Sequence, residues 1–354
     1  MEFQYTDVFQ NQHWIKFNPD NPYELCCNGV ERVLFLNWSP GLTKFNYYSP
    51  PRDKKDFATP DRERCHYTKT VFLPGTQIAV TGTTGGDLLV WDRTLIIMGI
   101  GEQDEKRLVK IVTLNQEEVP GHFDAITMLL TVDNQYLVVG NSDGTIRFYD
   151  FTFKAVAWFE KELNLSTIKS ISFSNKIPVN AAQDKDPDGT SKFKCSDFIV
   201  ADSNAMVVQL KSTIFEAIDK NKKRGQTLMI GIKSSISAIA CHPYKTLLAL
   251  AGAEGFVIIY DYVQRGDPKF HQYEQYTKDT REKKVEQAPA DKSKGKKGEE
   301  DPAAAKKEEK EKSQRNKVFT TLEFTPQGDE LLVGQANGTI QIIDPETGKY
   351  KELS

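Results

Sequence analysis

Apolar residues in this chain gather in short runs separated by turn residues, a pattern typical of β-strands rather than helices. Residues 121–150 show it most clearly, because apolar runs at 126–130 and 136–139 flank Asp133-Asn134 and a third run follows Asp143-Gly144. Both faces of such strands are apolar, so each strand needs a neighbouring sheet on either side. Asp143-Gly144 is expected to supply the positive backbone dihedral angles of a tight hairpin. We therefore predict a small antiparallel sheet packed between two others.

The same arrangement recurs along the chain. Four times a Gly stands six residues before an Asp, with an apolar strand between them. The Gly residues are Gly86, Gly144, Gly255 and Gly338, and the Asp residues are Asp92, Asp150, Asp261 and Asp344. Degraded copies begin at Trp14 and Thr167. Repetition of strands and turns at this spacing predicts an all-β propeller of the WD-repeat type, with about six recognisable four-stranded blades.

The repeats also divide the chain. Blades one to five are expected within residues 1–276, and blade six within residues 318–354. Repeat proteins normally end in atypical capping units, whereas blade six is well formed and stops abruptly. We therefore expect an incomplete ring that another chain, or sequence not included here, completes. A six-bladed ring closed by the terminal pieces is the alternative.

Residues 277–317 differ in kind from the repeats. They hold fourteen Lys or Arg against ten Asp or Glu, one Val and no aromatic residue. Such a segment buries too little apolar surface to offset its ordering entropy, so we predict a disordered Lys/Glu-rich insertion. A basic arm that reaches an acidic partner, such as a tubulin tail, is the second interpretation.

Composition narrows the class of protein. A net charge of −3 gives no reason to expect a nucleic-acid partner. No apolar run approaches the roughly 18 residues of a membrane helix, and the first residues do not read as a signal peptide. The five cysteines show no paired metal-ligand spacing, which favours a reduced cytoplasmic setting.

Two residues of the reference repeat resemble part of a WD-repeat signature. Gly121 and His122 open the repeat, and the third strand ends in Tyr149-Asp150 where such repeats have Trp-Asp. His122 and Asp143 match two members of the hydrogen-bonded His, Ser/Thr, Asp and Trp tetrad of that family. Val139 stands at the Ser/Thr position. We expect a partial network with a structural role, and no catalytic role for His122.

An apparent calcium loop begins at Asp184. Asp184, Asp186 and Asp188 fit the first three ligand positions of an EF-hand. Lys192 and Cys195 then occupy positions nine and twelve, where the motif needs an oxygen ligand and a bidentate Glu. We expect a solvated loop, no metal and no cofactor.

Three further features of the sequence are candidates for a metal site, a cap or a docking motif. Cys26 and Cys27 are adjacent in a predicted strand, so they point to opposite faces and form no joint metal site. His242 lies where a strand meets a turn, and we expect it to pack or cap there. Trp91 to Thr94 resembles the Trp-Asp-x-Arg box of ubiquitin-ligase adaptors, but the Arg stands one place early. No catalytic constellation is found, and an enzyme is not expected.

Several longer phrases extend the resemblance. NYYSPPRDKKDF from Asn46, GGDLLVWD from Gly85, IRFYDFTFKAVAWF from Ile146, TIKSISFS from Thr167 and ISAIACHPYKTLLALAG from Ile236 stand in this order. Together they resemble the family of cilia- and flagella-associated protein 251, a WD-repeat subunit of the calmodulin- and spoke-associated complex. The similarity runs over roughly residues 32–347, apart from the charged insertion.

This resemblance implies a function that composition alone does not show. It implies a non-enzymatic scaffold of the ciliary axoneme that docks at the base of radial spoke three on doublet microtubules and supports dynein-driven motility. Expected partners are other radial-spoke and spoke-complex subunits, with tubulin as a further candidate. Family members are longer and carry an EF-hand-like region that these residues lack. A recruiting or trafficking adaptor in a cytosolic complex is the alternative.

Overall fold

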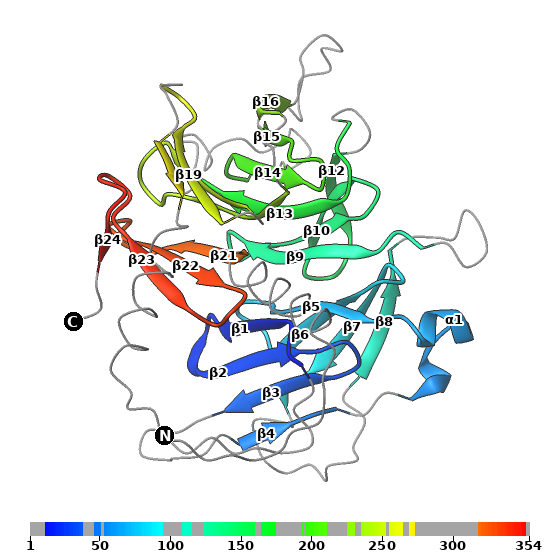
Figure 1. Cartoon of the computed structure of the whole chain (residues 1–354). Coiled ribbons are helices and arrows are strands. Elements are labelled where there is room, and N and C mark those ends of the chain that lie inside the picture. The colour runs from blue at the N-terminus through cyan, green and yellow to red at the C-terminus, as the bar shows by residue number, and fades with distance from the viewer. Residues whose placement is uncertain are drawn as a thin grey trace, which may run out of the picture. The chain divides into compact units, whose positions relative to one another are not determined.

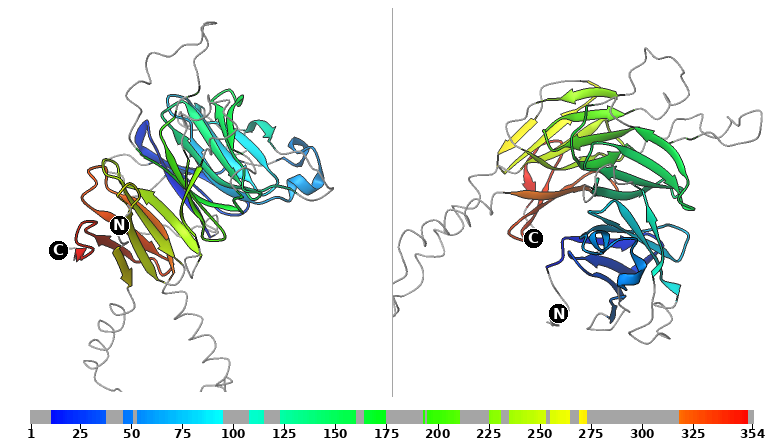
Figure 2. Two further views of the ribbon diagram at one scale, coloured as in Figure 1. Left: turned by 90° about the horizontal axis from the view of Figure 1, so that it is seen from above. Right: turned by 90° about the vertical axis from the view of Figure 1, so that its right-hand side faces the viewer.

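The structure is a computed structural model in which every described sheet is antiparallel and four-stranded (Figure 1). The described residues are 11–37, 46–50, 53–94, 108–114, 123–159, 164–174, 193, 195–210, 225–230, 235–252, 255–264, 269–272 and 318–351. They form six sheets, three in each of two compact units. In each sheet the strands follow one another in chain order, and Figure 2 shows their twist from two further sides.

The first unit holds blades one to three. Blade one comprises β1 (Trp14–Asn18), β2 (Asn21–Asn28), β3 (Val33–Asn37) and β4 (Asn46–Tyr48). The 3-10 turn η1 (Lys54–Asp56) and the helix α1 (Pro60–Glu63) follow. Blade two comprises β5 (Tyr67–Phe72), β6 (Ile78–Thr83), β7 (Asp87–Asp92) and β8 (Leu108–Thr113), and blade three comprises β9 (Ile126–Val132), β10 (Tyr136–Asn141), β11 (Ile146–Asp150) and β12 (Ala155–Phe159).

The second unit holds blades four to six. Blade four comprises β13 (Ile168–Phe173), β14 (Phe198–Asp202), β15 (Val207–Leu210) and β16 (Gly225–Met229). Blade five comprises β17 (Ile236–Cys241), β18 (Leu247–Gly252), β19 (Phe256–Asp261) and β20 (Lys269–Gln272). Blade six comprises β21 (Phe319–Phe324), β22 (Leu331–Gln335), β23 (Ile340–Ile343) and β24 (Tyr350–Lys351).

Within each unit, neighbouring sheets meet through their first strands and fan apart. In the first unit β5 contacts both β1 and β9, and in the second unit β17 contacts β21. Sheets that converge at the first strand and diverge toward the fourth are the blades of a β-propeller. The predicted fold class is therefore confirmed, with six blades.

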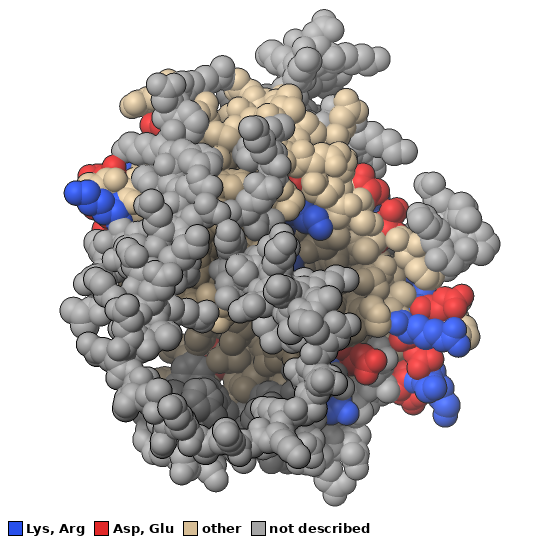
Figure 3. All heavy atoms as spheres, viewed as in Figure 1, with Lys and Arg blue, Asp and Glu red and all other residues tan. Residues whose placement is uncertain are grey.

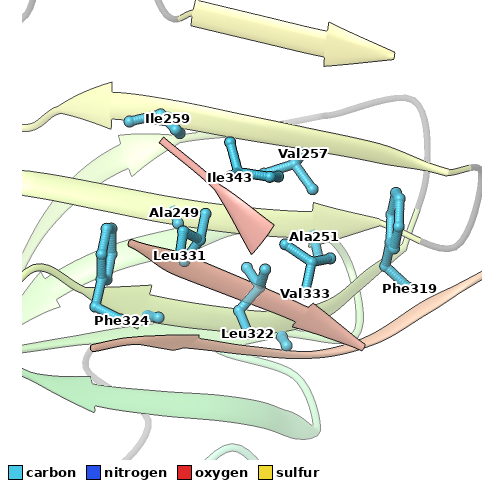
Figure 4. Close-up of a cluster of buried hydrophobic side chains, with 12 residues drawn as sticks. Ala249, Ala251, Val257, Ile259, Phe319, Leu322, Phe324, Leu331, Val333 and Ile343 are labelled. Carbon is cyan, nitrogen blue, oxygen red and sulfur yellow. The ribbon is translucent and has the colours of Figure 1, made fainter. Parts of the chain in front are cut away.

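The core of each unit lies between its sheets, as the doubly apolar strands predict. Blade two packs one face on blade one through Phe72 and Leu89, and the other face on blade three through Val80 and Leu88. In the second unit, side chains of blades five and six interlock in the same manner (Figure 4). Alternate residues of one strand thus point into different cores. The burial explains why the strand sequences are apolar on both sides.

The Gly residues of the repeat lie at the turn between the second and third strands. Gly86, Gly144, Gly255 and Gly338 have φ of 76°, 85°, 78° and 83°, where a Cβ would cost energy. Blade four has Ala205 at the equivalent turn, with φ of 57°. We predicted that Asp143 also takes a positive φ, and this prediction is wrong. Among the described non-Gly residues, positive φ angles occur at other positions, including Asp133 and Asn134.

Some secondary-structure elements were not predicted, and some predictions concern residues outside the described ranges. Helix α1 and strand β16 have no counterpart among the predicted elements. The insertion at 277–317 and the acidic residues Asp184, Asp186 and Asp188 lie outside the described residues, as does His122.

Candidate interaction surface and the interior that supports it

In four of the six blades, an Asp residue at the end of the third strand fixes the turn that follows. Asp92, Asp150 and Asp344 each accept the backbone N–H of the residue two positions on, at 2.9, 2.9 and 2.8 Å. Asp261 does the same with Val263 at 3.0 Å. Side-chain oxygens that bind a nearby N–H in this way stabilise tight turns. The structure therefore gives these four Asp residues a local structural contact.

Asp143 also makes local contacts. Its carboxylate accepts the N–H of Thr145 at 2.9 Å and the hydroxyl of Thr145 at 2.8 Å. Asn141 donates to the same hydroxyl at 2.8 Å. These bonds hold the turn that ends at Gly144, where an added Cβ would lie 2.0 Å from the carbonyl oxygen of Leu165.

A buried chain of hydrogen bonds lies in blade two and reaches blade one. The indole Nε1 of Trp91 donates to the Thr81 hydroxyl at 2.9 Å, and Thr81 lies 2.8 Å from the Thr70 hydroxyl. Thr70 in turn donates to Asn28 of blade one at 3.0 Å. The Trp and Thr residues in this chain of hydrogen bonds are residue types of the WD-repeat network. Our sequence reasoning missed it, although Trp91-Asp92 was the available signal.

Blades one and two are also joined by a buried ion pair. Arg93, which follows β7, donates from Nη1 to both oxygens of Glu24 on β2 at 2.6 and 2.5 Å. The exposed fractions of the two side chains are 1% and 3%. Asn18 donates to Glu24 at 2.6 Å, and the guanidinium lies 4.7 Å from the ring centroid of Phe72. Arg93 is therefore enclosed between two blades and cannot serve as an adaptor box on the surface.

A second ion pair ties helix α1 to blade two. Arg62 donates to the Asp87 carboxylate at 2.6 Å and to the carbonyl oxygen of Gly85 at 3.1 Å. Its guanidinium also lies 4.8 Å from the ring centroid of Phe123. Thr59 caps the helix by accepting the N–H of Arg62. This short helix therefore places the guanidinium of Arg62 against the turn that precedes β7.

Cys26 and Cys27 point to opposite faces, as predicted. Cys26 belongs to the core shared with blade two, and Cys27 lies on the other face of blade one. Burial raises the pKa of both thiols, that of Cys27 to about 11, so both are protonated at neutral pH. Protonated buried thiols behave as small apolar groups.

His242 caps a turn, as predicted. Its Nδ1 accepts the N–H groups of Tyr244 at 3.0 Å and Lys245 at 2.9 Å. Because Nδ1 accepts both bonds, the imidazole is neutral, with its proton on Nε2. Burial lowers the pKa of His242, and the charge of Lys245 lowers it further.

Exposed apolar side chains gather on the face of blade one that points away from blade two. Strand register places Ile15, Phe17, Tyr23 and Tyr47 on that face, with exposed fractions of 60, 56, 44 and 38%. The buried centre of the same face is formed by Leu25, Cys27, Leu34 and Leu36. Exposed aromatic and aliphatic groups around a buried apolar centre are typical of contact surfaces.

Two outer strands also present apolar side chains. Val109 on β8 is 59% exposed, and Trp158 on β12 is 49% exposed. The fourth strand is the edge of its sheet, so a side chain there is accessible to another molecule. On the face seen in Figure 3, Lys and Arg of the described residues lie beside Asp and Glu rather than in a region of one sign.

Among the residues that the structure describes, no group of three or more His, Cys, Asp or Glu side chains is placed to hold a metal ion. No helix there has the length and apolar character needed to cross a bilayer.

These observations define a class: a six-bladed β-propeller whose buried polar groups join blades and whose exposed apolar groups lie on a blade face and on outer strands. Comparison with known proteins identifies the family. A model of the CFAP251 N-terminal domain matches residues 2–215. The chain therefore belongs to the family of cilia- and flagella-associated protein 251.

Individual relatives agree with this assignment. The chain is 36% identical over 245 residues to cilia- and flagella-associated protein 251 of Chlamydomonas reinhardtii, covering 69% of this chain and 29% of the relative. It is 34% identical over 267 residues to the protein of that name in Tetrahymena thermophila, covering 72% and 26%. The corresponding Pongo abelii protein is 30% identical over 264 residues, covering 71% and 21%. The chain thus spans less than a third of the length of each of these relatives.

Proposed function

We propose that this chain is a non-enzymatic WD-repeat scaffold of the ciliary axoneme. In this proposal it docks at the base of radial spoke three on doublet microtubules and supports the regulation of dynein-driven motility. Its partners are radial-spoke subunits and subunits of the calmodulin- and spoke-associated complex. The observation that carries the proposal is family membership across residues 2–215, together with relatives named as cilia- and flagella-associated proteins.

The interior of the first unit supports a scaffold role. Its buried cations, Arg62 and Arg93, are each paired with a carboxylate and fix one element against another. The hydrogen-bonded chain through Thr70, Thr81 and Trp91 does the same. Polar groups that are engaged in this way hold blades in one arrangement. A surface held in one arrangement loses little entropy when it binds a partner.

The outer strand β12 offers a candidate contact. Trp158 is 49% exposed there, and tryptophan is among the residues that most often dominate the binding energy of protein interfaces. Tyr244 is 67% exposed in the turn after β17 and provides a matched control in another blade.

Fractionation of cilia tests the proposal. The tagged chain is expressed in a ciliated cell, and isolated cilia are extracted first with detergent and then with high salt. We expect the chain to stay with the axoneme in detergent and to leave it together with spoke subunits. We expect Trp158→Ala to weaken this retention and Tyr244→Ala to leave it unchanged. Release of the unsubstituted chain with the detergent-soluble matrix would contradict the proposal.

A further inference from the structure

Two lysines stand close together on the first strands of blades one and two. Lys16 lies on β1 and Lys69 on β5, and these strands are in contact. Lys16 pairs with Cys26 in the sheet register, so its side chain lies on the face that packs toward blade two. Trp14, two residues before Lys16, shares that face. Lys16 is exposed, whereas Lys69 and Trp14 are partly buried.

The Trp14 ring lies beside the ammonium group of Lys69. The Nζ of Lys69 lies 3.8 Å from the centroid of the Trp14 ring. The indole Nε1 donates to the carbonyl oxygen of Thr70 at 2.8 Å, which holds the ring in place. A cation above an indole face is attracted by the ring quadrupole. The ammonium group of Lys69 is therefore held in a defined position against the indole face.

Within the described ranges, neither ammonium has a hydrogen bond or an ion pair with a carboxylate. The fully buried cations among the described residues of this unit, Arg62 and Arg93, are each paired with a carboxylate. Burial, together with the smaller effect of the positive charge of Lys16, lowers the pKa of Lys69 to about 8. Two adjacent cations without an acid between them are destabilised, and an anion placed between them would remove that cost.

We propose that Lys16, Lys69 and Trp14 form a binding site for a side-chain carboxylate of an acidic, glutamate-rich peptide. Strand β1 is the end strand of its sheet, so an extended peptide can lie along it. Both cations are lysines, which act as compact point charges. Each ammonium offers a single point charge and not the bidentate fork of arginine. The choice of a carboxylate rests on the edge strand, along which a peptide can carry one, and inorganic phosphate is the alternative ligand in the test.

The binding experiment uses the full chain and a short glutamate-rich peptide, measured by calorimetry at low and high salt. We expect binding that weakens with salt, and Lys16→Met and Lys69→Met each to weaken it about tenfold or more. The matched control is Lys110→Met. Lys110 also lies over an aromatic ring, 4.6 Å from the centroid of Phe153, and its substitution should leave the affinity unchanged.

Amine labelling and stability give independent readouts. In the absence of peptide, Lys69 should react with an amine-directed reagent at pH 8 faster than Lys110, and the peptide should protect it. Because Lys69→Met removes an uncompensated charge, this variant should melt no lower than the unsubstituted chain. The proposal is overturned if the chain does not bind the peptide, or if Lys110→Met loses as much affinity as Lys69→Met. It is also overturned if inorganic phosphate, added at the same concentration of negative charge as the peptide, displaces the peptide. None of these outcomes bears on axonemal retention, so this proposal and the proposed function can fail separately.

Discussion

Neutralising Glu24 tests most directly whether a buried ion pair joins blades one and two. Glu24→Gln keeps the size of the side chain and removes its charge, which leaves the guanidinium of Arg93 buried without a carboxylate. The oxygens of Glu24 lie 2.5 and 2.6 Å from Nη1, and the exposed fractions of both side chains are a few per cent or less. Two charges about 4 Å apart attract by about 4 kcal/mol at an effective dielectric constant of about 20. Breaking a buried pair from one side typically costs about 3–5 kcal/mol.

We therefore expect Glu24→Gln to lower the free energy of unfolding of the first unit by about 3–5 kcal/mol. For a unit of this size the melting temperature should fall by roughly 6–20 °C, at about 2–4 °C per kcal/mol. Thermal melting measures the size of the loss. Hydrogen exchange followed by mass spectrometry locates it, because β2 and β7 should exchange faster while strands of blade six keep their protection.

Two further variants control the interpretation. Glu346 forms an exposed ion pair with Lys245, with exposed fractions of 68 and 52%, so Glu346→Gln should change stability by less than about 1 kcal/mol. The double variant Glu24→Leu with Arg93→Met removes both buried charges and should regain most of the loss. If Glu24→Gln costs no more than Glu346→Gln, the ion pair does not join the blades as described.

The remaining predictions concern single contacts. His242 has a pKa below its usual value, so its contribution to stability is complete above the unfolded pKa of about 6.5 and is lost as the pH falls through the folded pKa. Melting between pH 5 and 8 should show this loss, and His242→Asn, which keeps an acceptor but does not titrate, should flatten it. Ala205→Gly should stabilise the chain by about 1 kcal/mol in urea denaturation, because Ala205 has a left-handed backbone; a loss would show that φ does not limit this turn. Gly144→Ala should destabilise it by at least about 1–2 kcal/mol, since φ is positive and Leu165 leaves no room for a Cβ. Trp91→Phe should cost about 1 kcal/mol through the lost bond to Thr81, and a change below a few tenths would contradict that contact.

The blades were predictable because local chemistry fixes their turns. A Gly is required where φ is near 80°, and an Asp accepts the next available N–H groups, so both recur at constant spacing. Blade four was harder to recognise because Ala205 stands where the other turns have Gly. Strand β16, with the sequence GQTLM, has too few apolar residues to stand out.

The contacts between blades were not predictable in the same way. Glu24 and Arg93 are 69 residues apart, and only the stacking of two sheets brings them together. The pairing of Lys69 with Trp14 likewise depends on the contact of β1 with β5. The hydrogen-bonded network of blade two was not predicted, because the Gly-His signature pointed to blade three, whose His122 lies outside the described residues. A search for Trp with Thr on the adjacent strand would have found it.

Subtomogram averaging of axonemes that carry a tagged copy of this chain tests the central claim most directly. The account predicts added density at the base of radial spoke three on every doublet microtubule, with density there lost when the chain is absent. Tag density elsewhere on the doublet, or an unchanged spoke base in cells that lack the chain, would contradict it.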